Sequence, residues 1–177
     1  MSNKILVTAG IDPGPVSSAL VLWDGKLPCC VQDTANVTLL ETLNAIGRDY
    51  QVAHFGIEHI RGFGAKAGNE TFDTCEWIGK FELYLTSVAM ERAQWTVRKI
   101  PRKTVVAHHC GNATAGDSDT WKALKYRFGD PGTKKNPGVL RGIAGKHLPA
   151  ALAVAVYLWD VTKLEEYKIE EMAKRGR

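Results

Sequence analysis

Paired cysteines and long apolar runs are both missing from this sequence of 177 residues. Its four cysteines, Cys29, Cys30, Cys75 and Cys110, show no CxxC spacing, and two of them are adjacent, a geometry that rarely forms a disulfide with itself. These features exclude a disulfide scaffold and favour a reducing compartment, so we expect a cytoplasmic protein.

The sequence predicts neither insertion into a membrane nor secretion. The longest apolar run, residues 148–159, is shorter than the roughly 18 residues that a membrane-spanning helix needs. Residues 1–12 contain one lysine and no extended apolar stretch, which is unlike a signal peptide. We therefore expect no membrane partner.

The overall composition is that of a globular domain. Hydrophobic residues make up 45% and charged residues 24% of the chain, and a chain of this length can bury roughly 70% of its unfolded surface without disulfides or metals. We expect one domain over residues 1–161, followed by a charged C-terminal tail over residues 162–177.

Positive charge is concentrated in the middle of the chain. Residues 98–146 contain 11 lysines and arginines against 3 acidic residues, a net charge of +8, whereas the whole chain has +4. Such a segment favours contact with phosphates, although a solvated basic face has the same composition.

Apolar periodicity predicts a mixed α/β protein. The first three strands are joined by short turns, so they should form an antiparallel meander, and Asn36 has the residue type of an N-cap for the next helix. Glycine-rich segments at residues 61–69 and 129–142 are predicted to be irregular loops. The predicted strands are residues 5–12, 17–24, 29–33, 52–60 and 95–100, and the predicted helices are residues 37–49, 70–92, 102–110, 118–128 and 147–159.

Two acidic residues lie at the ends of apolar strands. Asp12 ends the first strand, directly before a Pro-Gly turn, and Glu58 lies near the end of the fourth strand. An acid within an apolar strand is costly unless it is paired or binds a metal. If the two strands are neighbours, these carboxylates form a hard-oxygen site that suits Mg²⁺, with Mn²⁺ as a substitute. Each acid taken singly is also typical of an exposed strand end.

These motifs resemble those of the RuvC-like Holliday-junction resolvases of the ribonuclease H-like superfamily. The resemblance lies in the run GIDPG at residues 10–14, in Ile57-Glu58, and in an alanine-rich late helix preceded by His147. It implies an α/β fold with a five-stranded mixed sheet, three antiparallel strands followed by two parallel ones, flanked by helices. It also implies a homodimer that cuts branched DNA, with divalent ions held by carboxylates of the first strand, the fourth strand and the last helix.

The last helix departs from the family's pattern. The family shows Asp or His, then two residues, then Asp, whereas this chain has His147-Leu148-Pro149-Ala150. His147 matches the first position, where a neutral imidazole ligates a metal or orients the attacking water, but Ala150 can do neither. Three interpretations stay open: a phage-type lineage that uses His147 and another acid, an engineered inactive variant, and a natural binder that no longer cuts.

Asp117 and His147 each have a structural alternative to a catalytic role. Asp117 or Ser118 can cap the helix predicted at residues 118–128, and Asp117 can instead replace the carboxylate missing at Ala150. A lone histidine before a helix is often a surface or cap residue. We predict Asp12, Glu58, His147 and Asp117 as catalytic residues, the first three of them as metal ligands.

The remaining predictions concern DNA and the second subunit. The glycine-rich loop after the fourth strand can fold over DNA, with a phenylalanine stacking on an unpaired base, although an ordinary flexible loop has the same composition. The long helix at residues 70–92 is the predicted dimer surface, with Trp77 and Phe81 between the subunits. The predicted DNA contacts are Arg61, Phe63, Lys66, Arg98, Lys99, Arg102, Lys103, Lys134, Lys135, Arg141 and Lys146.

The sequence therefore predicts a Mg²⁺-dependent, structure-selective endodeoxyribonuclease that cuts four-way or other branched DNA. A sugar-kinase or actin-like protein also begins with a Gly-x-Asp turn after its first strand, but it needs two domains of this fold, and 177 residues are too few. A non-catalytic junction-binding protein of the same fold is the alternative, and Ala150 is the reason to consider it.

Overall fold

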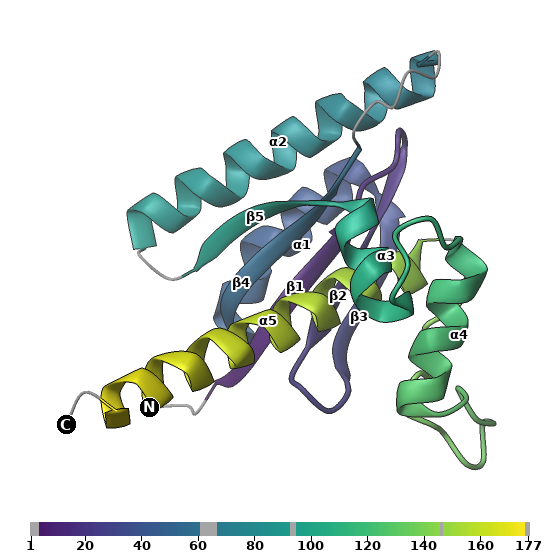
Figure 1. Ribbon diagram of the computed structural model, residues 1–177. Helices are drawn as coiled ribbons and strands as arrows, with labels where there is room; N and C mark the ends of the chain where they lie inside the picture. The colour runs from purple at the N-terminus through teal and green to yellow at the C-terminus, as the bar shows by residue number, and fades with distance from the viewer. Residues whose placement is uncertain (1–3, 61–66, 93–94, 146, 176–177) are drawn as a thin grey trace.

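The protein is built on one mixed sheet that is covered by helices on both faces. The computed structural model describes residues 4–60, 67–92, 95–145 and 147–175 (Figure 1). The elements are β1 (Ile5–Asp12), β2 (Ser17–Trp23), β3 (Pro28–Ala35), α1 (Asn36–Asp49), β4 (Tyr50–His59), α2 (Asn69–Arg92), β5 (Thr96–Pro101), α3 (Arg102–Cys110), α4 (Asp117–Phe128) and α5 (Leu148–Arg175). No helix within these ranges is long and apolar enough to cross a membrane.

The sheet has the topology that the resemblance implies. Its strand order is β3-β2-β1-β4-β5; β1, β2 and β3 pair antiparallel, whereas β4 pairs parallel with both β1 and β5. The parallel pairs need crossover connections, which α1 and α2 supply. The predicted five-stranded mixed sheet is confirmed.

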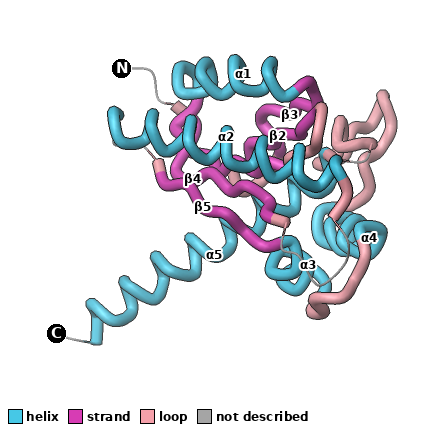
Figure 2. Tube along the Cα trace, turned by 90° about the horizontal axis from the view of Figure 1, so that it is seen from above, coloured by secondary structure: helices cyan, strands magenta, loops and turns pink. Residues whose placement is uncertain are grey.

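Figure 2 shows α1 and α2 on one face of the sheet and α3, α4 and α5 on the other. Each face has its own apolar core. The first contains Leu39, Leu43, Ile78, Phe81 and Leu85 from the two helices, and the second contains the alanine-rich first half of α5 together with Val105, Leu124, Leu140 and Ile143. The central strands are thus buried on both faces, which explains their nearly continuous apolar sequences.

Alternate residues of β1 and β4 face opposite sides of the sheet. Val7, Ala9 and Ile11 belong to the core under α1 and α2, so Thr8, Gly10 and Asp12 lie on the α5 face. The Thr8 hydroxyl donates a hydrogen bond to the Ala155 carbonyl of α5 at 2.7 Å. The same alternation puts Gly56 and Glu58 of β4 on the α5 face, because Phe55 and Ile57 belong to the other core.

Glycine allows α5 to lie unusually close to the sheet. A Cβ atom on Gly10 would lie 2.0 Å from the Ala151 carbonyl oxygen and 2.5 Å from the Ala155 nitrogen, and one on Gly56 would lie 2.6 Å from Val154 Cγ1. Side chains larger than hydrogen at these two positions would push the helix away from the sheet.

The predicted elements agree with the structure except at a few boundaries. Strand β3 extends to Ala35, beyond the predicted end at residue 33, and α5 continues to Arg175, so the predicted boundary between residues 161 and 162 lies inside a helix. The basic loop at residues 129–142 is not wholly irregular, because Gly132 and Pro137 form an antiparallel bridge.

The predicted interface residues of α2 need correction. Phe81 is fully buried in the core of its own chain, so the prediction that it lies between subunits is wrong. Trp77 is half-buried and packs against the same core. Periodicity shows that the helix has apolar stripes but not which of them faces the sheet.

We predict that Gly10→Ala destabilises the fold by about 3 kcal/mol, because the added methyl meets backbone atoms that cannot rotate away. The free energy of unfolding in urea measures the loss. Gly79→Ala is the matched control: Gly79 lies in α2 with open space around its Cβ position, so this variant should gain about 0.5–1 kcal/mol. Equal effects of the two substitutions would contradict the close packing of α5.

Candidate functional site

Asp12 and Glu58 lie at neighbouring strand ends on one face of the sheet. Ile11 pairs with Ile57 across the parallel ladder, so the residue after each of them, an acid in both cases, projects toward the N-terminal end of α5. The Glu58 side chain is buried, at 10% exposure, and that of Asp12 is similarly buried, at 14%. The predicted pairing of the two strands is confirmed.

A buried hydrogen-bond network holds the turn that follows Asp12. The Gly14 amide donates to Ser18 Oγ at 3.1 Å, the Asn36 side-chain amide donates to the Gly14 carbonyl at 3.0 Å, and the Ser18 hydroxyl donates to Asn36 Oδ1 at 2.5 Å. Asn36 is therefore not the N-cap that the sequence predicts: it is the first residue of α1, and Ala35 is the N-cap, without a side-chain bond. Nothing in the sequence pattern distinguishes this use of an asparagine from capping.

His147 lies against Asp12. Its Nδ1 is 2.9 Å from Asp12 Oδ2, and its carbonyl accepts the Ala151 amide at the start of α5. When Nδ1 donates to an ionised Asp12, the lone pair is on Nε2, which becomes the nitrogen through which the ring can bind a metal or accept a proton. The surface-cap interpretation of His147 does not account for this contact across 135 residues of sequence.

Arg102 connects the two other predicted catalytic acids. Its Nη1 donates to Glu58 Oε1 at 2.9 Å, and its Nη2 contacts Asp117 Oδ1. Arg102 lies beside Glu58 because Glu58 pairs with Ile100 in the β4–β5 ladder, and α3 begins directly after β5. The sequence predicts Arg102 as a DNA contact, and no sequence signal indicates its contact with these two acids.

The capping role considered for Asp117 and Ser118 is wrong. Helix α4 begins at Asp117 with Gly116 as N-cap, and the Gly116 amide donates to Asp119 Oδ2 at 3.2 Å. Asp117 instead contributes its carboxylate to the Arg102 contact, near the position of Ala150: Glu58, Arg102, Asp117 and Ala150 line one small cavity of about 20 Å³.

The two strand-end acids repel each other. Burial and the negative charge of Glu58 raise the pKa of Asp12 to about 6, against the lowering effects of His147 and Arg102. Like charges that raise a carboxyl pKa mark a place where a cation would be favourable.

The side chains at this site have donor atoms that suit a hard divalent cation, although they do not converge on one point. Carboxylate oxygens of Asp12 and Glu58 with one imidazole suit Mg²⁺ or Mn²⁺. Within the part of the chain that the structure describes, no three His, Cys, Asp or Glu side chains converge as a metal site. Arg102 bonds one carboxylate oxygen of Glu58 at 2.9 Å.

The predicted DNA-contacting residues do not all lie beside this site. Arg102 and Lys103 do, since both line a cavity of about 440 Å³ with Glu58. Lys99 instead forms an ion pair of 2.7 Å with Glu82 of α2, on the other face of the sheet. Arg98 pairs with Gly56, two residues before Glu58. Lys134, Lys135 and Arg141 are exposed in the loop after α4, whereas Arg61, Phe63, Lys66 and Lys146 lie outside the described residues.

The arrangement of elements has known counterparts among solved structures. RuvC of Thermus thermophilus in complex with a Holliday junction substrate superposes with a TM-score of 0.59 and 19% identity, over 85% of this chain and 90% of that one. Another structure of the same protein gives 0.56 and 19%, over 85% and 91%. The chain has the RuvC-type, ribonuclease H-like fold. The yeast mitochondrial Holliday junction resolvase Ydc2 gives 0.49 and 11%, over 86% and 78%. No protein-family model and no curated protein matches the sequence.

We predict that Glu58→Gln lowers the pKa of Asp12 in this RuvC-like fold, because it removes the like charge that helps to raise it. The carboxyl carbon shift of Asp12, followed against pH in isotope-labelled protein without divalent ions, measures the change. Glu76→Gln removes a surface carboxylate of α2 that is paired with Lys80 and should leave the Asp12 pKa near 6. A wild-type Asp12 that titrates near 3.8 would refute the proximity of the two acids.

Proposed function

We propose that this protein is a Mg²⁺-dependent, structure-selective endodeoxyribonuclease that cuts four-way (Holliday) or other branched DNA. The observation that supports it most is the position of Glu58 on the strand beside Asp12, which contacts His147, in the fold of a protein whose structure is known with a Holliday junction. Magnesium, with manganese as a substitute, suits this donor set.

Asp12 and Glu58 would hold the divalent ions, and Asp117 is the next candidate for a carboxylate ligand because it lies beside Ala150. Bound there, the ions would supply positive charge to the attacking water and to the departing 3′-oxygen in an in-line displacement at phosphorus. His147, oriented by Asp12 through Nδ1, would accept or deliver a proton at Nε2.

Arg102 would change partners during this process. In the structure it balances the charge of Glu58 and Asp117. A divalent ion held by these carboxylates would supply that charge instead, and the Arg102 guanidinium would then be free to bind a phosphate of the DNA with its planar set of donors. The basic residues Lys103, Lys134, Lys135 and Arg141 supply further candidates for backbone contacts.

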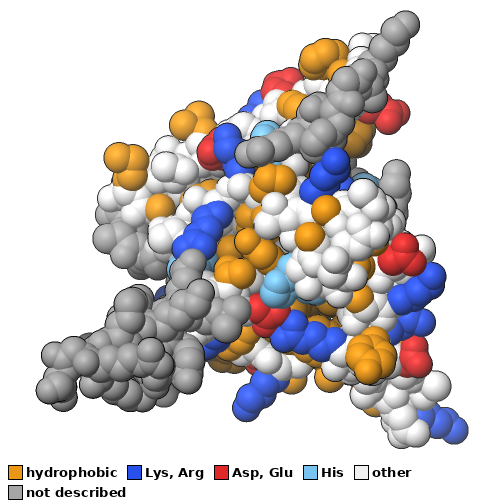
Figure 3. Space-filling model, in the orientation of Figure 1, with side chains coloured by type: hydrophobic (Ala, Val, Ile, Leu, Met, Phe, Trp, Pro, Cys, Tyr) orange, Lys and Arg blue, Asp and Glu red, His pale blue; other side chains and the backbone are white. Residues whose placement is uncertain are grey.

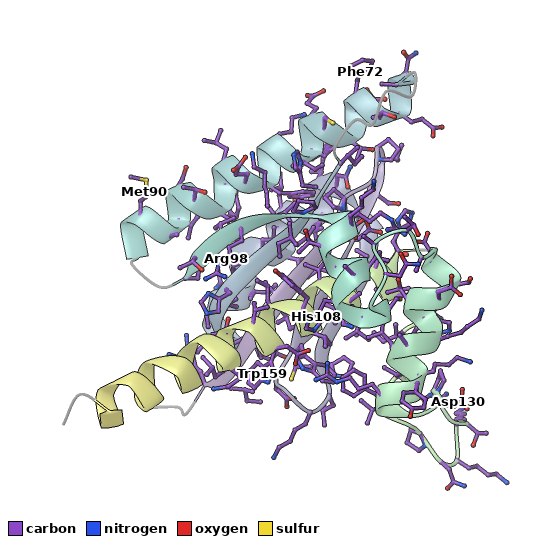
Figure 4. All side chains as sticks on the ribbon, viewed as in Figure 1. Phe72, Met90, Arg98, His108, Asp130 and Trp159 are labelled. Atoms are coloured by element: carbon purple, nitrogen blue, oxygen red, sulfur yellow. The ribbon has the colours of Figure 1, made fainter. Side chains whose placement is uncertain are left out.

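The enzyme should act as a homodimer. Symmetric cutting of a four-way junction needs two sites related by a two-fold axis, and one chain supplies one. Apolar side chains project from the outer side of α2, where Figure 4 labels Phe72 and Met90 and Figure 3 shows isolated hydrophobic side chains. Phe72, Leu83 and Met90 are 64%, 70% and 82% exposed and lie about three and two turns apart, on one stripe of the helix.

A reducing location such as the cytoplasm suits the protein. All four cysteines, Cys29, Cys30, Cys75 and Cys110, are free thiols in the structure. Burial raises the pKa of Cys29 to about 11 together with the charge of Asp24, which makes this thiol a poor nucleophile.

Asp12→Asn and Glu58→Gln should each abolish cutting while junction binding stays within a few-fold of wild type, because each removes charge at the metal site and leaves the basic contacts in place. Cleavage of a labelled four-way junction with Mg²⁺ or Mn²⁺, beside a gel-shift assay, measures both. His147→Ala should also lose cutting, whereas His147→Asp should keep part of it, because a carboxylate can also accept a proton and is a hard ligand for a divalent ion.

Cutting by Asp12→Asn or Glu58→Gln at the wild-type rate would refute the proposed site. A wild-type protein that binds junctions with either metal and never cuts them would favour the alternative, a non-catalytic junction-binding protein. Ala150 and the Arg102–Glu58 contact are the features that fit this alternative.

Leu83→Glu should convert a wild-type dimer into a monomer, with at least a tenfold weaker self-association, because it buries a charge in the α2 interface. Sedimentation at micromolar concentration measures the change. Val37→Glu is the matched control, since Val37 is an exposed apolar residue of α1, 61% accessible, outside the proposed interface. A wild-type monomer that stays monomeric with junction DNA would contradict the dimer.

A further inference from the structure

A pocket that the proposed reaction does not use lies next to the acidic site. It has a volume of about 720 Å³, within the range of small-molecule binding pockets, and lies between the first half of α4, the loop that follows α4, and the start of α5. Asp117 and Pro149 line both this pocket and the small cavity that contains Glu58 and Arg102. The pocket is therefore directly adjacent to the proposed reaction centre.

Trp121 makes this pocket different from an ordinary surface groove. The indole is half-buried, since part of it packs against the core around α5, while another part lines the pocket. Pro131, Pro149 and Ile143 add further apolar wall. An aromatic ring fixed by core packing presents a flat apolar surface at little conformational cost.

The loop that closes the pocket is fixed to the protein. Leu140 and Ile143 are 0% and 2% exposed and belong to the core around α5. The Ile143 amide donates to the Leu140 carbonyl at 3.1 Å, and the Gly132–Pro137 bridge closes a hairpin in the preceding segment. The pocket is thus held open by buried anchors.

The charges around the pocket suit a nucleic-acid strand. Arg141 lines it, and Lys134 and Lys135 are exposed on the hairpin. Figure 3 shows lysine and arginine side chains over α4 and this hairpin. The start of the loop, where it leaves α4, can be found in Figure 4 by the label of Asp130. Ser118 adds a hydroxyl that can bond the edge of a base.

We propose that this pocket receives an unpaired nucleobase next to the scissile phosphate, with the base stacked on Trp121 and its strand bound by Arg141. The proposal rests on the proposed nuclease function and would explain why the enzyme selects branched DNA. A base leaves its stack at the lowest cost where pairing is already disturbed, as at a branch point. A regular duplex would have to be opened before it could fill the pocket.

The test is a thermodynamic cycle between the tryptophan and the base. Four-way junctions, each lacking the base at one position around the crossover, are titrated by fluorescence anisotropy with Ca²⁺ in place of Mg²⁺. For wild type, one position should weaken binding by between about 5-fold and about 150-fold, the range for stacking of one base on an aromatic side chain. Trp121→Ala should weaken binding to the intact junction to a similar extent and should be insensitive to loss of that base.

Two variants guard against trivial outcomes. Tyr126→Ala is the matched control, because Tyr126 is an aromatic residue of the same helix, 95% exposed, that lines a different groove with His108 and His109; it should keep the wild-type response. If Trp121→Ala does not fold, Trp121→Leu retains apolar volume for the core without the aromatic plane and should give the same loss of coupling.

The results distinguish failure of the pocket assignment from failure of the proposed nuclease function. Additive effects of the tryptophan substitution and the missing base, or a wild type that is insensitive at every position, would overturn the pocket assignment alone. Coupling without any cleavage of junctions in Mg²⁺ or Mn²⁺ would leave the pocket as a base-binding site and overturn the proposed nuclease. A wild type that binds neither branched nor single-stranded DNA would overturn both.

Discussion

The close packing of α5 on the central strands is the constraint on which the rest of this structure depends. Gly10 and Gly56 leave no room for a side chain beneath Ala151, Ala155 and Val154, so the helix axis is fixed at short range from the sheet. Because β1 ends in Asp12 on that same face, the beginning of the helix cannot move without moving His147 relative to Asp12. Packing and site geometry are therefore two consequences of one contact.

This packing also explains the electrostatics of the site. A helix held at such a distance excludes water from the strand ends, and burial is the main cause of the raised pKa of Asp12, with the charge of Glu58 second. The positive charge that compensates Glu58 comes from outside the sheet, from Arg102 at the start of α3. Near the other end of α3, His108 bonds Asp160 of α5, and Arg127 of α4 bonds the same carboxylate. Burial alone would raise the pKa of Asp160, but these bonds hold it at about 2.

Local patterns predict the strands, the antiparallel pairing of the first three strands and the two strand-end acids, because strands buried on both faces have nearly continuous apolar sequences. The two parallel strands are expected from the family resemblance alone. Local patterns do not predict what depends on tertiary contacts between distant segments. Asn36 looks like a cap and instead supports the turn after Asp12; Arg102 looks like a phosphate ligand and bonds Glu58. Phe81 looks available for a partner because periodicity identifies an apolar stripe without identifying what covers it.

The loop after α4 is a further case in which tertiary contacts, not local sequence, determine the structure. Its glycines, prolines and lysines predict an irregular basic segment, and only the burial of Leu140 and Ile143 in the α5 core reveals that it forms one wall of a stable pocket. Trp121 is held by that core too. Since the core that fixes α5 over the carboxylates also fixes the tryptophan and the loop, the distance between the pocket and the acids is set by the fold. Under the proposed function, a strand bound across both would be held by rigid elements on each side of the phosphate to be cut, which is the arrangement that positioning of a substrate requires.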